Sequence, residues 1–340
     1  MEDTAIEIGR LPNGQETPKG LLYHYTTLEG LLGIVKSEAI RATHIRYLND
    51  ASELDNAFSP ESTYPLLESL FPDPGQEVKE LVRALMKPPQ DRYDAFVASF
   101  TDDGATKQDP GDRLSQWRAY SDISGGCSLG FDHDLILKGW EKSGIRAAGA
   151  ECNLLRCKYT ALEKAQVAKS IGETRSKDFN QALNQYLSLF EGENGRAPNQ
   201  AEVEDLQKRS IARVLGVSCA DYYLEAAGFK DKSFSEELEW RILIHAVRQN
   251  LLLEHSKNPD VPIINFRRGK FGMTPYVELP LNLKAPESPL RRIVIGPAPH
   301  REESVMAVRM LLESNGIGIK GENVPNGVEV KGSEIPYRNW

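Results

Sequence analysis

Residues 21–36 read LLYHYTTLEGLLGIVK. Residues 21–25 are aromatic and apolar, which is typical of a half-buried strand. Thr26 and Glu29 have the spacing of a capping box, in which each side chain accepts a hydrogen bond from the other residue's backbone NH. Apolar residues then follow at i, i+3, i+4 and i+7, namely Leu28, Leu31, Leu32 and Val35. The stretch predicts a strand that leads directly into an amphipathic helix, with a second strand returning over residues 40–45.

Three residues at this junction are candidates for binding a ligand: His24, Tyr25 and Thr26. The N-terminus of a helix gathers backbone NH donors and favours anionic groups. A histidine at the end of a strand is more often simply hydrogen-bonded to its neighbours, and His24 taken alone favours that simpler interpretation.

The composition is that of an ordinary globular protein. The chain has 340 residues, of which 40% are hydrophobic and 26% charged, enough for one large domain with insertions or for two domains. The formal net charge of −8, from 41 basic and 49 acidic residues, argues against broad non-specific nucleic-acid binding but allows a local basic groove. We find no apolar run of membrane-spanning length and no signal peptide, so we expect a cytoplasmic protein without a membrane partner.

The cysteines and histidines form no metal-binding motif. Cys127, Cys152, Cys157 and Cys219 include no CxxC pair and have no histidine at zinc spacing, and no HExxH sequence occurs. We therefore expect reduced, buried thiols and no bound metal.

Two polar positions follow the second predicted strand. Tyr47 and Asn49 belong to the sequence YLND, in which Asn49-Asp50 breaks the strand. Side chains placed just past a strand can line a pocket, although local chemistry favours a turn followed by a helix N-cap.

A second informative stretch covers residues 112–131 and contains SQWRAY followed by GGCSLGF. Trp117 and Tyr120 are three residues apart, so a helix would place them on one face, with Arg118 between them. Two aromatic side chains on one face are most often core. The alternative is that one of them stacks on a flat ligand ring.

A third stretch, residues 234–245, reads FSEELEWRILIH. Period-two alternation predicts a strand with Glu237, Glu239 and Arg241 on one face and large apolar residues on the other. A solvated charged face is the usual explanation. A strand this apolar on one side is also expected to be central, and carboxylates on a central strand often belong to a site.

The remaining pattern outlines the domain organisation. Residues 1–18 look like a polar N-terminal arm, and residues 161–230 are mainly helical. The strand pattern resumes directly after residue 230. We therefore expect a single α+β domain over residues 19–340 with a helical insertion at 161–230.

Seven segments together resemble the bacterial family of unknown function numbered 2971. They are LYHYTTLEGLLGIVKSEAIRAT (22–43), YLNDASE (47–53), SFTDD (99–103), SQWRAY (115–120), GGCSLGFD (125–132), EELEWRI (236–242) and LRRIVIGP (290–297). The resemblance runs from about Leu21 to the C-terminus, but the family name implies no activity.

A second resemblance does imply an activity. A strand with a histidine, then threonine, then a leucine-rich helix leading to a second strand is similar to the opening of ADP-ribosyltransferase domains. Those domains use a histidine of the first strand, an aromatic of a middle element and a glutamate of a later strand, often within Glu-x-Glu. His24 matches the first, Tyr120 or Tyr47 the second, and Glu239, with Glu237 two residues before it, the third. The resemblance implies a split, mostly antiparallel sheet surrounded by helices.

The same resemblance implies NAD as substrate. Cleavage of the bond between nicotinamide and ribose develops positive charge on the ribose, which the carboxylate of Glu239 would stabilise. Tyr120 or Trp117 would stack on nicotinamide, His24 would hold the adenosine-side ribose, and Arg241 or Arg118 would contact the pyrophosphate. Glu237 would orient an acceptor.

Two other functions remain open. A non-catalytic sensor would bind a nucleotide or a partner in the same pocket, and an NAD hydrolase would use the same site without an acceptor. The acceptor of a transferase is not specified by the sequence: protein, nucleic acid and small molecule all fit. By family-level analogy only, related bacterial families often resemble toxins or antiviral defence effectors.

Overall fold

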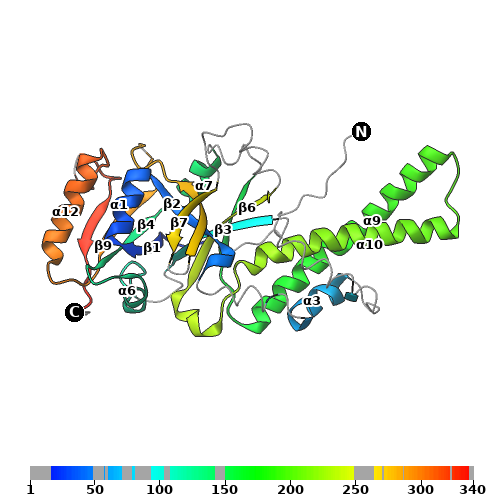
Figure 1. Cartoon of the computed structure of the whole chain (residues 1–340), viewed down its shortest axis with the longest axis horizontal. Coiled ribbons are helices and arrows are strands. Elements are labelled where there is room, and N and C mark those ends of the chain that lie inside the picture. Colours follow the sequence, from blue (N-terminus) through cyan, green and yellow to red (C-terminus); the bar gives the residue numbers. More distant parts are fainter. Residues whose placement is uncertain are drawn as a thin grey trace.

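The structure is a computed structural model, and it describes residues 17–48, 57, 60–70, 79–80, 93–102, 108–141, 150–248, 264–269, 272–285, 287–321 and 324–336. The molecule is elongated: a β-sheet and its covering helices occupy one end, and a long pair of helices projects from the other (Figure 1).

In the described ranges the sheet contains ten strands and is almost entirely antiparallel. The strands are β1 (Leu22–Thr27), β2 (Ala39–His44), β3 (Tyr93–Thr101), β4 (Gly126–Phe131), β5 (Glu151–Arg156), β6 (Glu239–Val247), β7 (Asn265–Gly269), β8 (Gly272–Pro280), β9 (Leu290–Ile295) and β10 (Glu329–Gly332). Their order is β10-β9-β4-β1-β3-β2-β8-β7, with β6 paired to β3 and β5 paired to β6. Of these pairs, β9 with β10 is parallel.

The helices complete an α+β architecture. They are α1 (Leu28–Ser37), α3 (Pro60–Leu70), α6 (Leu114–Tyr120), α7 (His133–Glu141), α9 (Ala161–Asn194), α10 (Gln200–Ala226) and α12 (Arg301–Ser314), with short 3₁₀ helices η1 (Ile45–Tyr47) and η2 (Lys232–Glu237). The predicted α+β class and mostly antiparallel sheet are confirmed.

Strand β3 is the point at which the sheet divides. Along one edge it pairs with β6, where Thr101 lies opposite Glu239. Along its other edge it pairs with β1 at Thr101 opposite Tyr23, and with β2 at Val97 opposite Thr43. Strands β1 and β2 therefore diverge from β3 in different directions, and α1 joins them.

The N-cap of α1 is one residue later than the sequence pattern predicts. Thr27, not Thr26, caps the helix by accepting a hydrogen bond from the NH of Gly30 at 3.1 Å. The reason is that β1 stays paired with β4 as far as Thr27 opposite Gly126. The third helical residue is then Gly30, which has no side chain to complete a capping box. A Cβ at Gly30 would lie 2.0 Å from Oγ1 of Thr26, so glycine permits this close approach.

Helices α9 and α10 occupy the predicted helical insertion. Each begins with a capping box, made by Thr160 with Glu163 and by Asn199 with Glu202. Gly195 ends α9 in the left-handed conformation, with φ 65°. The inner parts of both helices pack with α3 on the sheet, and their outer ends project away from it (Figure 1).

The central strands β3 and β6 are buried on both faces. Phe96 and Ile242 belong to one apolar cluster, which also includes residues of α1, α7 and α12. Val97 and Leu243 belong to a second cluster, with residues of α3, α9 and α10. The solvated charged face considered for residues 237–243 is therefore wrong, because the helical insertion covers that face.

Other sequence predictions differ from the structure in where a segment begins or ends. Residues 234–237 form part of η2 rather than a strand, and Leu238 has a φ of 46°, so β6 begins only at Glu239. The predicted polar arm over residues 1–18 lies, except for its last two residues, outside the described residues. Within the described ranges, no helix is long and apolar enough to cross a membrane.

Candidate active site

A cleft opens where β1 separates from β3. Its lining comes from β1, β3, α6, the turn before β6 and the first residue of β6. It consists of Tyr23, His24, Tyr25, Ser99, Phe100, Thr101, Gln116, Tyr120, Glu237 and Glu239. The space within it is about 320 Å³ when the part that is open to solvent is included. The cleft thus brings together the residues that sequence similarity assigned to catalysis, His24, Glu237 and Glu239, with the aromatic Tyr120.

Glu239 is held by two cations at the edge of this cleft. Lys230 Nζ donates to Oε2 at 2.5 Å, and Arg241 Nε donates to Oε1 at 2.8 Å. The backbone NH of Glu239 donates to the hydroxyl of Tyr159 at 2.7 Å. With a side chain only 5% exposed, the carboxylate is fixed in one orientation.

The charges of this cluster stabilise one another. Burial alone would raise the pKa of Glu239, but Arg241 and Lys230 outweigh burial and hold that pKa at about 2. Burial disfavours the charged form of Lys230, yet Glu239 and Glu237 raise its pKa. Both groups are therefore ionised at neutral pH.

Glu237 reaches the same lysine, with Nζ of Lys230 2.5 Å from its Oε2. The left-handed conformation of Leu238 turns the chain between η2 and β6. The hydroxyl of Thr101 fixes this turn by donating to the Glu237 carbonyl at 2.6 Å. Spacing within Glu-x-Glu therefore places both carboxylates at one site, although the two residues do not share a strand.

His24 lies on the opposite side of β3 from Glu239. Its Nδ1 is 2.9 Å from the carbonyl oxygen of Ser99. Since a carbonyl oxygen only accepts, Nδ1 carries the proton, which leaves Nε2 of the neutral ring as an acceptor. Burial lowers the pKa of His24, partly opposed by the bond to Ser99, and so favours this neutral form.

Helix α6 supplies the aromatic wall of the cleft. Tyr120 is 40% exposed and lines the cleft together with Gln116. These residues are four apart, so they share one helical face. Gln116 was not predicted as a site residue, although its i, i+4 relationship with Tyr120 is visible in the sequence.

Trp117 faces the other way and does not stack on a cleft ligand. It is 1% exposed, and its ring packs edge-on against Tyr25 with centroids 4.7 Å apart. Its Nε1 donates to Asp112 at 2.7 Å. The structure therefore assigns Trp117 to the core, in agreement with the simpler interpretation of the aromatic pair, and leaves Tyr120 at the cleft.

Arg241 was predicted to contact the pyrophosphate, but the structure places it elsewhere. Besides binding Glu239, its Nη1 donates to the carbonyl of Ala227 at 2.7 Å. The residue is buried, because α10 covers this face of β6. Arg241 therefore acts within the protein as the partner of Glu239.

The other predicted binding residues lie outside the cleft lining. Thr26 lines a separate groove beside α1. Tyr47 is exposed in η1 and packs edge-on against His44, with centroids 5.6 Å apart. Arg118 is exposed on α6, and Asn49 lies outside the described residues.

Tyr25 connects the cleft to the loop before α6. Its hydroxyl donates to the carbonyl of Pro110 at 2.7 Å and accepts from the NH of Arg113 at 3.0 Å. The guanidinium of Arg113 donates to the hydroxyl of Thr101 at 3.2 Å and to the carbonyl of Asp102 at 2.7 Å. Arg113 thus supports the wall of the cleft from behind, a role that no local sequence pattern indicated.

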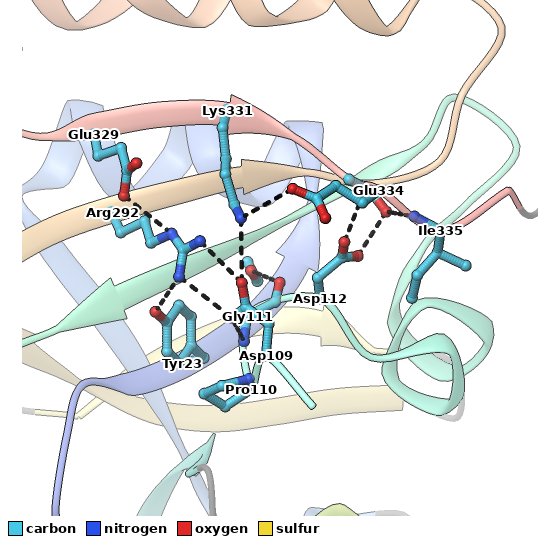
Figure 2. A network of polar contacts seen from close by, with 12 residues as sticks. Tyr23, Asp109, Pro110, Gly111, Asp112, Arg292, Glu329, Lys331, Glu334 and Ile335 are labelled. Carbon is cyan, nitrogen blue, oxygen red and sulfur yellow. Dashed lines mark hydrogen bonds and ion pairs between the residues drawn. The ribbon is translucent and has the colours of Figure 1, made fainter. Parts of the chain in front are cut away.

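A polar network anchors this loop to the C-terminal strands (Figure 2). Arg292 of β9 donates to Asp109 at 2.9 Å and to the hydroxyl of Tyr23 at 3.1 Å. Lys331 of β10 lies 3.2 Å from the same Asp109 carboxylate. Burial raises the pKa of Asp109, but the NH of Gly111 and these two cations outweigh it, so the pKa is lowered.

Asp112 forms the second half of the network. Its carboxylate accepts from Trp117, from the hydroxyl of Ser333 at 2.6 Å and from the NH of Glu334 at 2.7 Å. The C-terminal segment after β10 is therefore tied to the helix that carries Tyr120.

Metal chemistry has no obvious ligand set in the part of the chain that the structure describes. There, no group of three or more His, Cys, Asp or Glu side chains is arranged to hold an ion. Burial raises the thiol pKa of Cys152 and Cys219 to about 12, which disfavours their thiolates.

Residues 116–242 match the family model described as a protein of unknown function, DUF2971. The match begins in α6 and ends in β6, so it includes Tyr120, Lys230 and Glu239. It confirms the resemblance to that family over residues 116–242 and does not test the segments before and after this range. No curated protein and no solved structure matches the chain.

Proposed function

We propose that this chain, which carries the DUF2971 match, is an NAD-dependent ADP-ribosyltransferase-like enzyme. The observation that carries the proposal is the convergence of His24 and Glu239 on one cleft, from β1 and β6 on opposite sides of β3. These two residues are 215 positions apart in the chain, and their meeting in one cleft supports the proposal.

The chemistry of the cleft fits cleavage of the nicotinamide–ribose bond. The ionised Glu239 would accept a hydrogen bond from a ribose hydroxyl and stabilise the developing cation. Its two oxygens offer about four acceptor positions, and the donors Lys230 and Arg241 leave one of them open on Oε1. The exposed ring of Tyr120 would stack on nicotinamide, and neutral His24 would accept from the other ribose.

A second candidate function, non-catalytic binding, is suggested by the cluster of charged side chains around Glu239. Two carboxylates and two cations give the group of Glu237, Glu239, Lys230 and Arg241 no net charge, as in a purely structural buried network. In that case the cleft would bind a nucleotide or a partner without turnover. NAD hydrolysis is a third outcome, because it uses the same residues without an acceptor.

Nicotinamide release from NAD by the purified full chain tests the proposal. Release that increases with cell extract supports transfer, release that is unchanged by extract supports hydrolysis, and NAD binding without release supports the non-catalytic module. Tyr120→Ala is expected to reduce release strongly. Tyr64→Ala is its matched control, because Tyr64 is similarly exposed (42% against 40%) but lies on α3 outside the cleft.

A further inference from the structure

A second depression lies beside α1, where β1 and β2 have separated. It is lined by residues of α1, by Thr26 and Thr27 of β1, by Ala39 and Arg41 of β2 and by Arg267 and Arg268 of β7. The space within it is about 1300 Å³, against about 320 Å³ for the cleft, when the part open to solvent is included in both. This groove is not explained by the chemistry proposed for Glu239.

The groove is basic although the whole chain is acidic. Its lining includes Lys36, Arg41, Arg267 and Arg268 against one carboxylate, that of Glu29. Within the described ranges, none of the four cations forms an ion pair with a carboxylate. A local excess of positive charge therefore exists in a protein whose formal net charge is −8, and it favours an anionic ligand.

Two of the arginines are held in place despite their like charge. Arg267 donates to the hydroxyl of Thr43 at 3.1 Å, and the Arg41 guanidinium lies over the ring of Tyr276 at 5.2 Å from its centroid. Burial and the neighbouring Arg41 both lower the pKa of Arg267. An anion bound between the two guanidiniums would remove this repulsion, so the site is preorganised for one.

The groove adjoins the candidate active site along β1. His24 and Tyr25 line the cleft, and the next two residues, Thr26 and Thr27, line the groove. A strand advances about 3.3 Å per residue, which places Thr26 roughly 7 Å beyond His24. A ligand extended along the groove would therefore reach the mouth of the cleft.

We propose that this groove binds the phosphodiester backbone of a single-stranded nucleic acid. Arginine side chains match phosphate oxygens in geometry as well as charge. The groove also contains the exposed Leu32. Phe266 is 62% exposed and lies two residues before Arg268 on β7, so these two side chains share a face of the strand. Apolar and aromatic surface beside a basic track is the arrangement on which unpaired bases stack. The role of the nucleic acid as an acceptor of ADP-ribose rests on the proposed function. The binding of the nucleic acid to the groove does not.

The test is fluorescence anisotropy with a labelled single-stranded DNA or RNA oligonucleotide of mixed sequence and the full chain, without NAD. The triple variant Arg41→Gln, Arg267→Gln, Arg268→Gln is expected to bind roughly tenfold or more weakly, with a salt slope smaller by about 2. The control Lys169→Gln, Lys208→Gln, Arg209→Gln removes the same number of charges from exposed positions of α9 and α10. It is expected to bind like the wild type.

Four results would overturn the proposal: no binding by the wild type, equal loss in the control, equally tight binding of poly-glutamate, or complete displacement by ADP-ribose. The third would indicate an acidic protein partner, and the fourth would show that the groove holds the phosphates of NAD. Oligonucleotide binding by a wild-type protein that releases no nicotinamide from NAD would leave this inference intact while the proposed function fails.

Discussion

Lys230 donates to Glu239 across 2.5 Å, between side chains that are 3% and 5% exposed. This pair joins the end of the helical insertion to the first residue of β6. It therefore couples the stability of the fold to the orientation of the proposed catalytic carboxylate.

Removing Lys230 should be far more costly than removing an exposed lysine with the same geometry. Lys230→Met is expected to lower the free energy of unfolding by about 3–5 kcal/mol, because it removes one of the two cations that hold the buried carboxylate of Glu239. Lys284 also lies 2.5 Å from a carboxylate, Glu38, but the two side chains are 51% and 28% exposed. Lys284→Met should cost no more than about 1 kcal/mol in urea titrations, and equal losses would contradict the account.

Glu239 should also make the free energy of unfolding depend on pH in the acidic range. Its pKa of about 2 in the folded protein lies below the ordinary value of 4.5, so its stabilisation is present above about pH 4.5 and is lost as pH falls toward 2. The loss is expected to be on the order of 3 kcal/mol. Urea unfolding between pH 5 and 2.5 should show a shallower decline for Glu239→Gln than for the wild type, and parallel declines would argue against the shifted pKa.

The two aromatic residues of α6 should contribute very differently to the stability of the fold. Trp117→Ala is expected to cost about 3–5 kcal/mol, since it empties a buried site and leaves Asp112 with one donor fewer. Tyr120→Ala should stay within about 0.5 kcal/mol, because its ring is substantially exposed. Thermal unfolding of both variants checks this, and a stable Trp117→Ala protein would refute the assignment of Trp117 to the core.

Glu225 should respond to pH in the opposite sense from Glu239. Burial raises its pKa to about 7, only partly opposed by Lys158. The folded protein therefore binds an extra proton between about pH 4.5 and 7, and stability contributed by Glu225 falls as pH rises through that window. The free energy of unfolding of Glu225→Gln minus that of the wild type, measured with urea, should be larger at pH 8 than at pH 4.5. An unchanged difference between the two pH values would exclude this linkage.

The sequence predicted what local periodicity determines. The strand bearing His24, the helix after it and the helical character of residues 161–230 all follow from side-chain spacing, whereas the N-cap moved from Thr26 to Thr27 because pairing with β4 extends the strand. Local pattern cannot decide such tertiary competition.

Long-range contacts were not predictable in the same way. Lys230 and Arg113 reach the site from segments whose sequence carries no recognisable motif, and Arg241 turned inward because α10 covers its face of the sheet. Trp117 and Tyr120 share a helix, yet only packing against Tyr25 decides which of them is core.

Nicotinamide release by wild type and Glu239→Gln, compared at equal folded fraction, tests the central claim most directly. The account predicts release by the wild type and a loss of roughly a hundredfold or more in the variant, with the folded fraction measured because Lys230 loses its charged partner. Equal release by both proteins, or none by a folded wild type that also fails to bind NAD, would contradict an active site at Glu239.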